Sequence, residues 1–227
     1  MKVRDHGPGS RTRVRRQPRR GFYDGPTIHG ILDEALIGHV GFVMDELPYV
    51  IPMVVVRRGE ELLLHGSAAS RLTRHLAAGA EVCVCVTHLD GIVVSRSVFD
   101  NSMNYRSVVV FGRARTIIDE DEKLKALHAI VERLLPGRWQ EARNPSDKEL
   151  RATTILALPL TTASAKVRSG PPQDDAADLE LPVWAGEIPL EIVSLDPRPD
   201  PLLGDDIAVP DSVARFRSTL GAQARVR

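Results

Sequence analysis

The chain has 227 residues and no formal net charge, because 30 lysines and arginines balance 30 aspartates and glutamates. This length favours one domain, and the charge balance does not support a general attraction to nucleic acid. An aromatic content of 4% argues against stacking platforms for single strands. The sequence has no apolar run of about 18 residues that could span a membrane, and no secretory h-region follows the basic N-terminus. We therefore expect a cytoplasmic protein that contacts no membrane.

Residues 1–20 form a basic segment without hydrophobic periodicity. We expect a disordered or loosely docked arm, which could also cover an anionic ligand in a partner subunit. A nucleic-acid-binding tail is an alternative, but it lacks a supporting basic fold. A mitochondrial transit peptide would need an amphipathic helix, which the prolines and glycines disfavour. The arginines of this arm are Arg4, Arg11, Arg13, Arg15, Arg16, Arg19 and Arg20.

A helix is predicted to start at Pro26–Thr27 and to end at Gly38. Its apolar residues follow the i, i+3, i+4, i+7 spacing of a helix with one buried face. Residues 39–45 and 49–57 then read as an antiparallel pair of strands, joined by residues 46–48. Pro52 lies inside the second strand, and since proline cannot donate to a ladder, it indicates a sheet edge, a bulge or a ligand contact.

Residues 61–65 are predicted to form a third strand, which leads directly into the turn Gly66-Ser67-Ala68-Ala69-Ser70-Arg71 and a helix. Small residues before a helix N-terminus form a natural phosphate site, because free N–H groups and the helix dipole point at the anion. Ser67 and Ser70 can donate hydrogen bonds, and Arg71 can bind phosphate oxygens with its fork of donors. The alternative is that Ser70 is an ordinary helix cap. His65 lies next to this turn and is assigned no catalytic role.

Residues 81–88 and 91–97 are predicted to form a hairpin, because Asp90-Gly91 is a strong turn signal. Cys83 and Cys85 alternate with valines on the first strand and so share one face. We interpret them as buried small apolar side chains, since this placement suits a disulfide poorly and two ligands do not make a zinc site. The histidines show no ligand spacing with acidic or thiol partners, and no metal site is predicted.

A polar loop is predicted at residues 98–106, before a strand at 107–118. Its density of hydroxyls, amides and arginine suggests that it holds an anion or a polar heterocycle. Asn104 offers both a donor and an acceptor, Tyr105 could stack or pack, and Arg106 could bind either phosphate or an acidic neighbour. The alternative is a long solvated hairpin loop.

The remaining elements indicate a mainly β protein. We expect a helix at 120–135, a short helix capped by Ser146 at 146–151, and strands at 153–159 and 163–168. About seven short strands with two or three helices predict a closed or split antiparallel barrel with attached helices. After the arm, we assign residues 21–168 to the barrel and 169–227 to a C-terminal extension. In that extension Trp184 could be a core anchor, 189–195 could add a strand, and 212–220 a terminal helix.

Four motifs in order resemble the pyridoxamine 5′-phosphate oxidase-related flavin-binding proteins, and most of all the nitroimidazole-resistance branch. They are HGSAASR, SRSVFDNSMNYRSVVVFG, AKVRSGPP and PVWAGEIPL, and the similarity runs from about residue 15 to 201. The resemblance implies a split β-barrel that binds flavin mononucleotide (FMN) non-covalently, in a homodimer with flavin at the interface and the C-terminal extension packed there. The implied cofactor contacts are Val50, Ile51, Pro52, Met53, His65, Gly66, Ser67, Ser70, Arg71, Asn104, Tyr105, Arg106, Ser107, Lys166 and Trp184.

The resemblance further implies a flavin-dependent oxidoreductase that reduces a small acceptor such as a nitro compound or a quinone. No residue pattern identifies an acid or base. Three alternatives stay open: a flavin-binding protein without turnover, a deazaflavin-binding relative, and a haem-binding relative, in which His65 is the only obvious axial ligand. We do not expect a nucleic-acid-binding regulator, because that interpretation rests on the arm alone.

Overall fold

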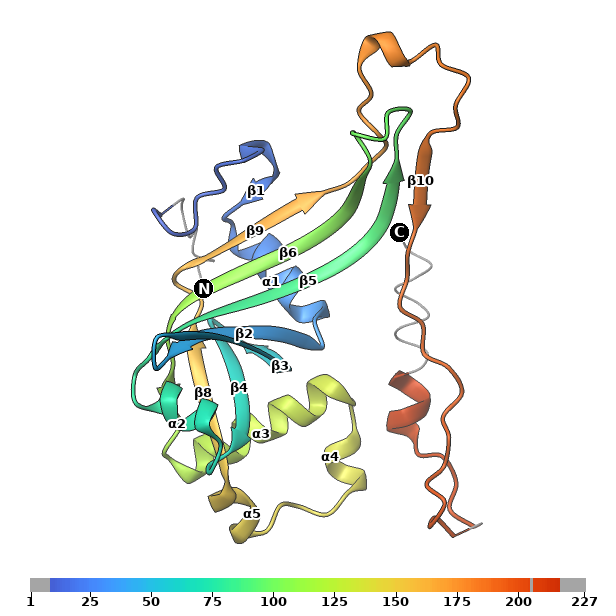
Figure 1. The fold of residues 1–227 in the computed structure, drawn as a ribbon. Coiled ribbons are helices and arrows are strands. Elements are labelled where there is room, and N and C mark those ends of the chain that lie inside the picture. Colours follow the sequence, from blue (N-terminus) through green and yellow to red (C-terminus); the bar gives the residue numbers. More distant parts are fainter. Residues whose placement is uncertain (1–8, 205, 217–227) are drawn as a thin grey trace.

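The computed structural model describes residues 9–204 and 206–216, and it shows a mainly antiparallel β protein with attached helices (Figure 1). The strand order is β1-β9-β6-β5-β2-β3-β4-β8-β7, and β10 pairs with β5. The strands are β1 (Gly21–Phe22), β2 (Ile37–Met44), β3 (Leu47–Arg58), β4 (Glu61–Ser67), β5 (Glu81–Val94), β6 (Ser102–Arg113), β7 (Arg115–Thr116), β8 (Thr153–Pro159), β9 (Ala163–Arg168) and β10 (Gly186–Pro189). The helices are α1 (Gly25–Glu34), α2 (Arg71–Ala77), α3 (Glu120–Leu134), α4 (Arg138–Glu141) and α5 (Asp147–Ala152), with 3-10 turns η1 (Pro18–Arg20) and η2 (Ala176–Asp178).

The sheet divides at β3, which changes partner along its length. Residues 47–54 pair with β2, whereas residues 55–58 pair with β4. From this point β4 continues beside β8 and diverges from β3. Pro52 therefore lies where β3 has a neighbour on one side only, as the edge interpretation of this proline predicts. The predicted split barrel is confirmed.

The core has two parts, one on each face of the sheet. Inside the barrel, residues from α1 and α2 such as Ile28, Leu32 and Leu76 pack on β2, β5, β6, β8 and β9. On the other face α3 covers β3, β4 and β8, with Ile130 packed against Leu63 and its neighbours. Both clusters consist of fully apolar side chains, so their burial provides the hydrophobic stabilisation of the fold.

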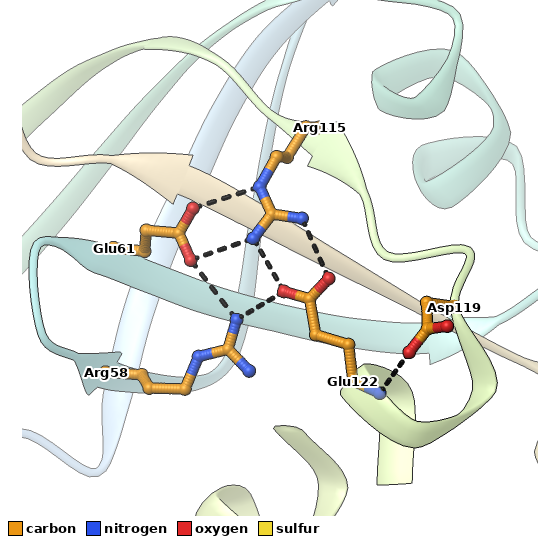
Figure 2. Close-up of polar contacts among 5 residues, drawn as sticks. All are labelled: Arg58, Glu61, Arg115, Asp119 and Glu122. Atoms are coloured by element: carbon orange, nitrogen blue, oxygen red, sulfur yellow. Dashed lines mark hydrogen bonds and ion pairs between the residues drawn. The ribbon is translucent and has the colours of Figure 1, made fainter. Parts of the chain in front are cut away.

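The first turn of α3 is fixed to the sheet by a network of four charged side chains (Figure 2). Arg115 of β7 donates to both Glu61 and Glu122, and Arg58 donates to the same two carboxylates. Burial alone would raise the pKa of Glu61, but the hydrogen bonds from Arg115 and Arg58 lower it below its usual value. Asp119 caps the helix as its side chain accepts from the Glu122 N–H at 2.8 Å. The predicted α3 helix is confirmed, as is the capping of α5 by Ser146.

The N-terminal half differs from the prediction at two turns. Helix α1 is capped by Asp24 and ends at Glu34, so Gly38 is not its terminator and lies within β2. The turn between β2 and β3 consists of Asp45 and Glu46 alone, with φ angles of 51° and 62°. Positive φ at both central residues is the backbone of a type I′ hairpin, which matches the twist of the flanking strands.

The Asp90-Gly91 hairpin was a wrong prediction. Residues 81–94 form one strand, β5, with an irregular step between Leu89 and Gly91. Strand β6 pairs with β5 on both sides of this step, so pairing with β6 overrides the local turn preference. The chain reverses instead at residues 95–101, where the Ser95 N–H donates to Asn101 Oδ1 at 2.8 Å. Residues 104–106 consequently belong to strand β6 and not to a loop.

The N-terminal arm differs from the prediction in the residues that the structure describes. The described part of the arm, residues 9–20, docks on the barrel: the Val14 N–H donates to Tyr23 Oη at 2.9 Å, Thr12 is buried, and Arg11 forms an ion pair with Glu81 of β5. Of the two expectations for the arm, these residues show a docked arm and not a disordered one. Cys83 and Cys85 are half-buried and unpaired with each other, which corrects their interpretation as buried side chains and agrees with the expectation that they form no disulfide.

The C-terminal extension leaves the barrel as strand β10 and runs down one side of the molecule (Figure 1). The added strand is therefore β10, and not residues 189–195. Trp184 is 65% exposed, so the core-anchor interpretation is wrong. Residues 211–216 are helical, and the rest of the predicted terminal helix lies outside the described residues. Within the described part of the chain, no helix is long and apolar enough to cross a membrane.

Candidate flavin site

The predicted phosphate-binding residues lie where β4 leaves β3 and enters α2. Arg71, the first residue of α2, is exposed, and its guanidinium carbon is 6.0 Å from the centre of the Tyr49 ring on β3. Arg71 forms no ion pair or hydrogen bond with any described residue. A cation over an aromatic face is stabilised by the ring quadrupole, yet all five guanidinium N–H donors can still bind an anion.

The two predicted serines of this turn differ in what their side chains do. Ser67 Oγ accepts from the Ala69 N–H at 3.2 Å, and the Ser67 carbonyl accepts from Thr73 Oγ1 at 2.6 Å. Ser70 is the N-cap residue of α2, but its side chain makes no capping hydrogen bond. The capping interpretation of Ser70 is therefore wrong for its hydroxyl, which can donate to a ligand beside Arg71.

The strand opposite α2 supplies an exposed edge. Val50 is 67% exposed and Ile51 37%, and Pro52 is also exposed. Tyr49 stacks on Phe42 of β2 with ring centroids 5.3 Å apart, and this holds the ring beneath Arg71. The predicted residues 50–53 and 65–71 are thus gathered around the division of the sheet.

His65 lies on β4, opposite Ile155 of β8 in the ladder. Its side chain is half-buried, and this burial lowers the pKa of the imidazole. A lowered pKa favours the neutral ring near neutral pH. No hydrogen bond or ion pair joins His65 to another described residue, so both ring nitrogens keep their capacity to bind.

The second set of predicted residues lies on β6 and β9. Asn104 is buried, and its Nδ2 donates to the Gly170 carbonyl at 3.2 Å and to Glu187 of β10, while its Oδ1 accepts from Arg168. Both ends of the amide are therefore bound within the chain. Burial lowers the pKa of Arg168, and the nearby Arg20 lowers it further.

Arg106 is held by two carboxylates. Its Nε and Nη2 donate to Asp90 at 2.9 Å each, and its Nη1 donates to Glu34 of α1 at 2.7 Å. Burial alone would lower the pKa of Arg106, but these hydrogen bonds raise it. Of the two predicted roles, the structure shows binding to acidic neighbours. Asp90 thus serves as an ion-pair partner and not as a turn residue.

Within one chain, the predicted residues on β6 and β9 lie apart from those on β3, β4 and α2. Ser107 of β6 pairs with Lys166 of β9 and donates to its carbonyl at 3.3 Å, and Tyr105 pairs with Arg168. Strands β5 and β2 separate β6 from β3, and three strand spacings correspond to about 14 Å along the sheet. Trp184 precedes β10, which pairs with the far end of β5.

The family model described as pyridoxamine 5′-phosphate oxidase matches residues 24–167, which is most of the barrel. The chain belongs to this family. Membership in the pyridoxamine 5′-phosphate oxidase family confirms the resemblance drawn from the sequence motifs. A search of curated proteins finds no match.

Solved structures of the same fold include haem and flavin proteins. The flavocytochrome Anf3 from Azotobacter vinelandii is 40% identical, with a TM-score of 0.88, and the match covers 92% of this chain and 98% of that one. The FAD- and haem-binding protein from Mycobacterium smegmatis is 36% identical, with a TM-score of 0.84 over 87% and 97% of the two chains. A candidate 5-nitroimidazole antibiotic resistance protein from Bacteroides thetaiotaomicron is 23% identical over 65% and 86%, with a TM-score of 0.53, and shows the fold alone.

Sequence reasoning missed several residues of this family member that shape the site. Tyr49 supports Arg71, and its only signal was its position at the start of the proline-containing strand. Arg168 and Glu187 hold Asn104, although they lie 64 and 83 positions away from it. Such contacts depend on the pairing of β6, β9 and β10, which local patterns do not reveal.

No metal-binding cluster was predicted. Across residues 9–204 and 206–216, no group of three or more histidine, cysteine, aspartate or glutamate side chains could hold a metal ion.

Proposed function

We propose that this chain binds a flavin nucleotide at the division between β3 and β4 and acts as a flavin-dependent oxidoreductase on a small acceptor, such as a nitro compound or a quinone. The observation that carries the proposal is Arg71, an exposed cation at the start of α2 that has no acidic partner among the described residues. The relatives named above, which are flavin- and haem-containing proteins at 40% and 36% identity, support a redox cofactor for this chain.

The residues at the division suit a flavin nucleotide chemically. Arg71 and the Ser70 hydroxyl provide charged and neutral donors for a phosphate group, and the exposed edge of β3 at residues 50–53 offers backbone groups to a ring. We propose FMN or flavin adenine dinucleotide (FAD), since a similar structure is a FAD- and haem-binding protein. The flavin would supply the electron-transfer chemistry, and the protein would supply binding, orientation and electrostatics.

We also propose a homodimer with flavin between the subunits. The residues on β3, β4 and α2 and those on β6 and β9 are separated by two strands within one chain. A two-fold pair would bring the first set of one copy near the second set of the other, because each copy presents both surfaces. In that arrangement Ser107, Lys166 and Trp184 would complete the site from the partner copy.

A second candidate function is haem binding, with or without flavin. His65 favours it, because its half-buried imidazole has a lowered pKa and no partner within the described chain. A neutral imidazole nitrogen is the usual proximal ligand of haem iron. Of the other histidines in described positions, His75 and His88 already contact backbone carbonyls, at 2.8 Å and 3.0 Å.

Absorption spectra of the purified protein test these proposals. The spectrum is recorded as purified, and again after FMN, FAD or haemin has been added in turn and the excess removed by desalting. Retained flavin bands in stoichiometric amount are expected. A Soret band that His65→Ala abolishes and His128→Ala preserves would support haem ligation by His65. A protein that retains neither flavin would contradict the main proposal.

A further inference from the structure

The N-terminal arm presents positive charge that its own chain does not neutralise. Residues 11–20 contain six arginines and no acidic residue. Arg11 pairs with Glu81, but four other arginines are exposed and form no ion pair with a described residue. We call these four the arm patch: Arg13, Arg15, Arg16 and Arg19. Guanidinium groups bind carboxylates and phosphates through paired hydrogen bonds, so the arm patch fits an anionic partner.

Arginines on the barrel are bound differently. Arg57 and Arg58 donate to carboxylates of their own chain, and so do Arg106 and Arg115. The chain as a whole has no formal net charge, so the arm patch is a local feature and not part of a basic protein. A local patch of one sign steers a partner of the opposite sign to one place on the surface, which increases the rate of association.

The described part of the arm holds this patch in a defined position. The Val14 N–H donates to Tyr23 Oη at 2.9 Å, Thr12 is buried, and the arm ends in the 3-10 turn η1. It then enters β1, the outermost strand of the order β1-β9-β6. Figure 1 shows this strand beside β9 at the end of the sheet. Because the backbone is already ordered, a partner that binds there loses less conformational entropy than with a flexible tail.

The arm also borders the second set of predicted cofactor residues. Gly21, which directly follows the arm, pairs with Lys166 of β9, and Lys166 pairs with Ser107 of β6. Arg20 lies close enough to Arg168 for its charge to lower the pKa of that guanidinium. A protein that docks on the arm patch would therefore lie beside residues that we propose to complete the flavin site.

The size of the arm indicates a transient contact. Its 12 described residues are about half of the roughly 20–30 residues that each partner contributes to a standard stable interface. Electron-transfer encounters have smaller interfaces than this standard, and charge complementarity gives them fast association. The proposed oxidoreductase needs such an encounter, because a donor must reduce its flavin again after each acceptor is reduced.

We propose that the arm patch docks an acidic one-electron carrier protein, of the ferredoxin or flavodoxin class, which reduces the flavin. This inference rests on the proposed function and names the electron donor for that site. Two carrier molecules, docking in turn, would each lose one electron. The flavin would take up both electrons with two protons from water, and would then pass them to the acceptor. Nucleic acid is the competing polyanion, but the neutral chain offers it no wider basic surface.

Calorimetric titration of the full chain with oxidised carriers tests the docking without relying on turnover. The probes are an acidic plant-type [2Fe–2S] ferredoxin and an acidic flavodoxin, each at low and high salt. We expect at least one carrier to bind the wild type, with a dissociation constant that rises with salt. This constant should rise at least about tenfold when the arm patch is reversed in charge. The arm variant is Arg13→Glu/Arg15→Glu/Arg16→Glu/Arg19→Glu.

A matched control separates the arm patch from net charge. It reverses four exposed charges elsewhere, so its net charge equals that of the arm variant, and it should weaken carrier binding less than about threefold. A milder arm variant with glutamine at the same four positions should weaken binding in the same direction as the glutamates do. In anaerobic stopped-flow mixing with the reduced carrier, the rate of flavin reduction should fall in the arm variants and not in the control. The control is Lys125→Glu/Lys148→Glu/Arg151→Glu/Arg198→Glu.

Four results would overturn the docking: no binding of either carrier, equal weakening in the arm and control variants, tighter binding of short duplex DNA than of both carriers, or loss of flavin from the arm variants, since the arm would then hold the cofactor. Flavin absorbance of the wild type separates the two proposals. A flavin-loaded protein that binds neither carrier would reject the docking and leave flavin binding intact. A flavin-free protein that binds a carrier through the arm patch would support the docking surface and contradict flavin binding.

Discussion

Arg71 and Arg106 belong to two regions that use the same side chain differently. Arg106 lies across the β5–β6 ladder, where its donors are taken up by Asp90 and Glu34. Arg71 lies at the division of the sheet, where the Tyr49 ring is the one partner of its guanidinium among the described residues. The difference teaches that a basic residue in a polar motif is a ligand candidate only when the fold leaves its donors unsatisfied. We expect Arg106 to stabilise the protein and Arg71 to bind the cofactor.

The largest expected effect is on stability, from Arg106→Ala. This change leaves two partly buried carboxylates without the guanidinium that both contact. We expect the free energy of unfolding to fall by about 2.5 kcal/mol, somewhat less than for a fully buried pair, because Glu34 and Asp90 keep some solvent contact. Urea denaturation measures it. Arg113→Ala, at an exposed position of the same strand, is the control and should change stability by less than about 0.5 kcal/mol. If both variants lose the same unfolding free energy, the ion pairs of Arg106 do not have the stabilising role assigned to them.

Arg71→Ala is expected to weaken flavin binding and to leave stability nearly unchanged. Loss of a charge-assisted contact to phosphate should weaken flavin affinity by about 2 kcal/mol, roughly thirtyfold, with little change in the unfolding free energy. Fluorescence titration of FMN or FAD measures it. Arg74→Ala, one turn away on the same helix and also exposed, should bind flavin as the wild type does. If both arginines weaken binding equally, a diffuse positive field and not a specific phosphate contact attracts the flavin.

How far the sequence predicts these two regions depends on the range of the contacts. Strands β8 and β9 have their predicted bounds, and α3 ends one residue early, because periodicity and caps are local signals. A split barrel was predicted from the strand count and the resemblance, but the place where the sheet divides was indicated only by Pro52, as one of three interpretations of that proline. Strand β5 was predicted as a hairpin because the Asp90-Gly91 signal is local, whereas its pairing with β6 is not. The carboxylates that bind Arg106 come from two separate elements, so no spacing rule could assign them.

The charged network of Figure 2 should make stability depend on pH. Hydrogen bonds from Arg115 and Arg58 outweigh burial and lower the pKa of Glu61 in the folded state. Its contribution is therefore fully present above the unfolded pKa of about 4.3 and is lost as pH falls through the lowered folded value. We expect Glu61→Gln to cost about 1 kcal/mol at pH 7 and progressively less below about pH 4. Denaturation curves across this range test it, with exposed Glu120→Gln as the control.

The smallest expected effects compare two helix caps. Ser146 forms a capping box with Glu149, so Ser146→Ala should lower the free energy of unfolding by about 1 kcal/mol. The Ser70 side chain makes no capping bond, so Ser70→Ala should change stability by less than about 0.5 kcal/mol while it weakens flavin binding. Thermal denaturation and flavin titration of both variants measure this. A Ser70 variant that loses stability but binds flavin normally would show that the hydroxyl caps the helix and does not bind the cofactor.

The most direct measurement compares FMN with riboflavin, which lacks the phosphate, on the wild type and on Arg71→Ala. If Arg71 binds the phosphate, the wild type should bind FMN more tightly than riboflavin. Arg71→Ala should reduce that preference at least tenfold and leave riboflavin affinity unchanged. A preference for FMN that survives in Arg71→Ala would contradict the account, because the phosphate would then be bound elsewhere in the molecule.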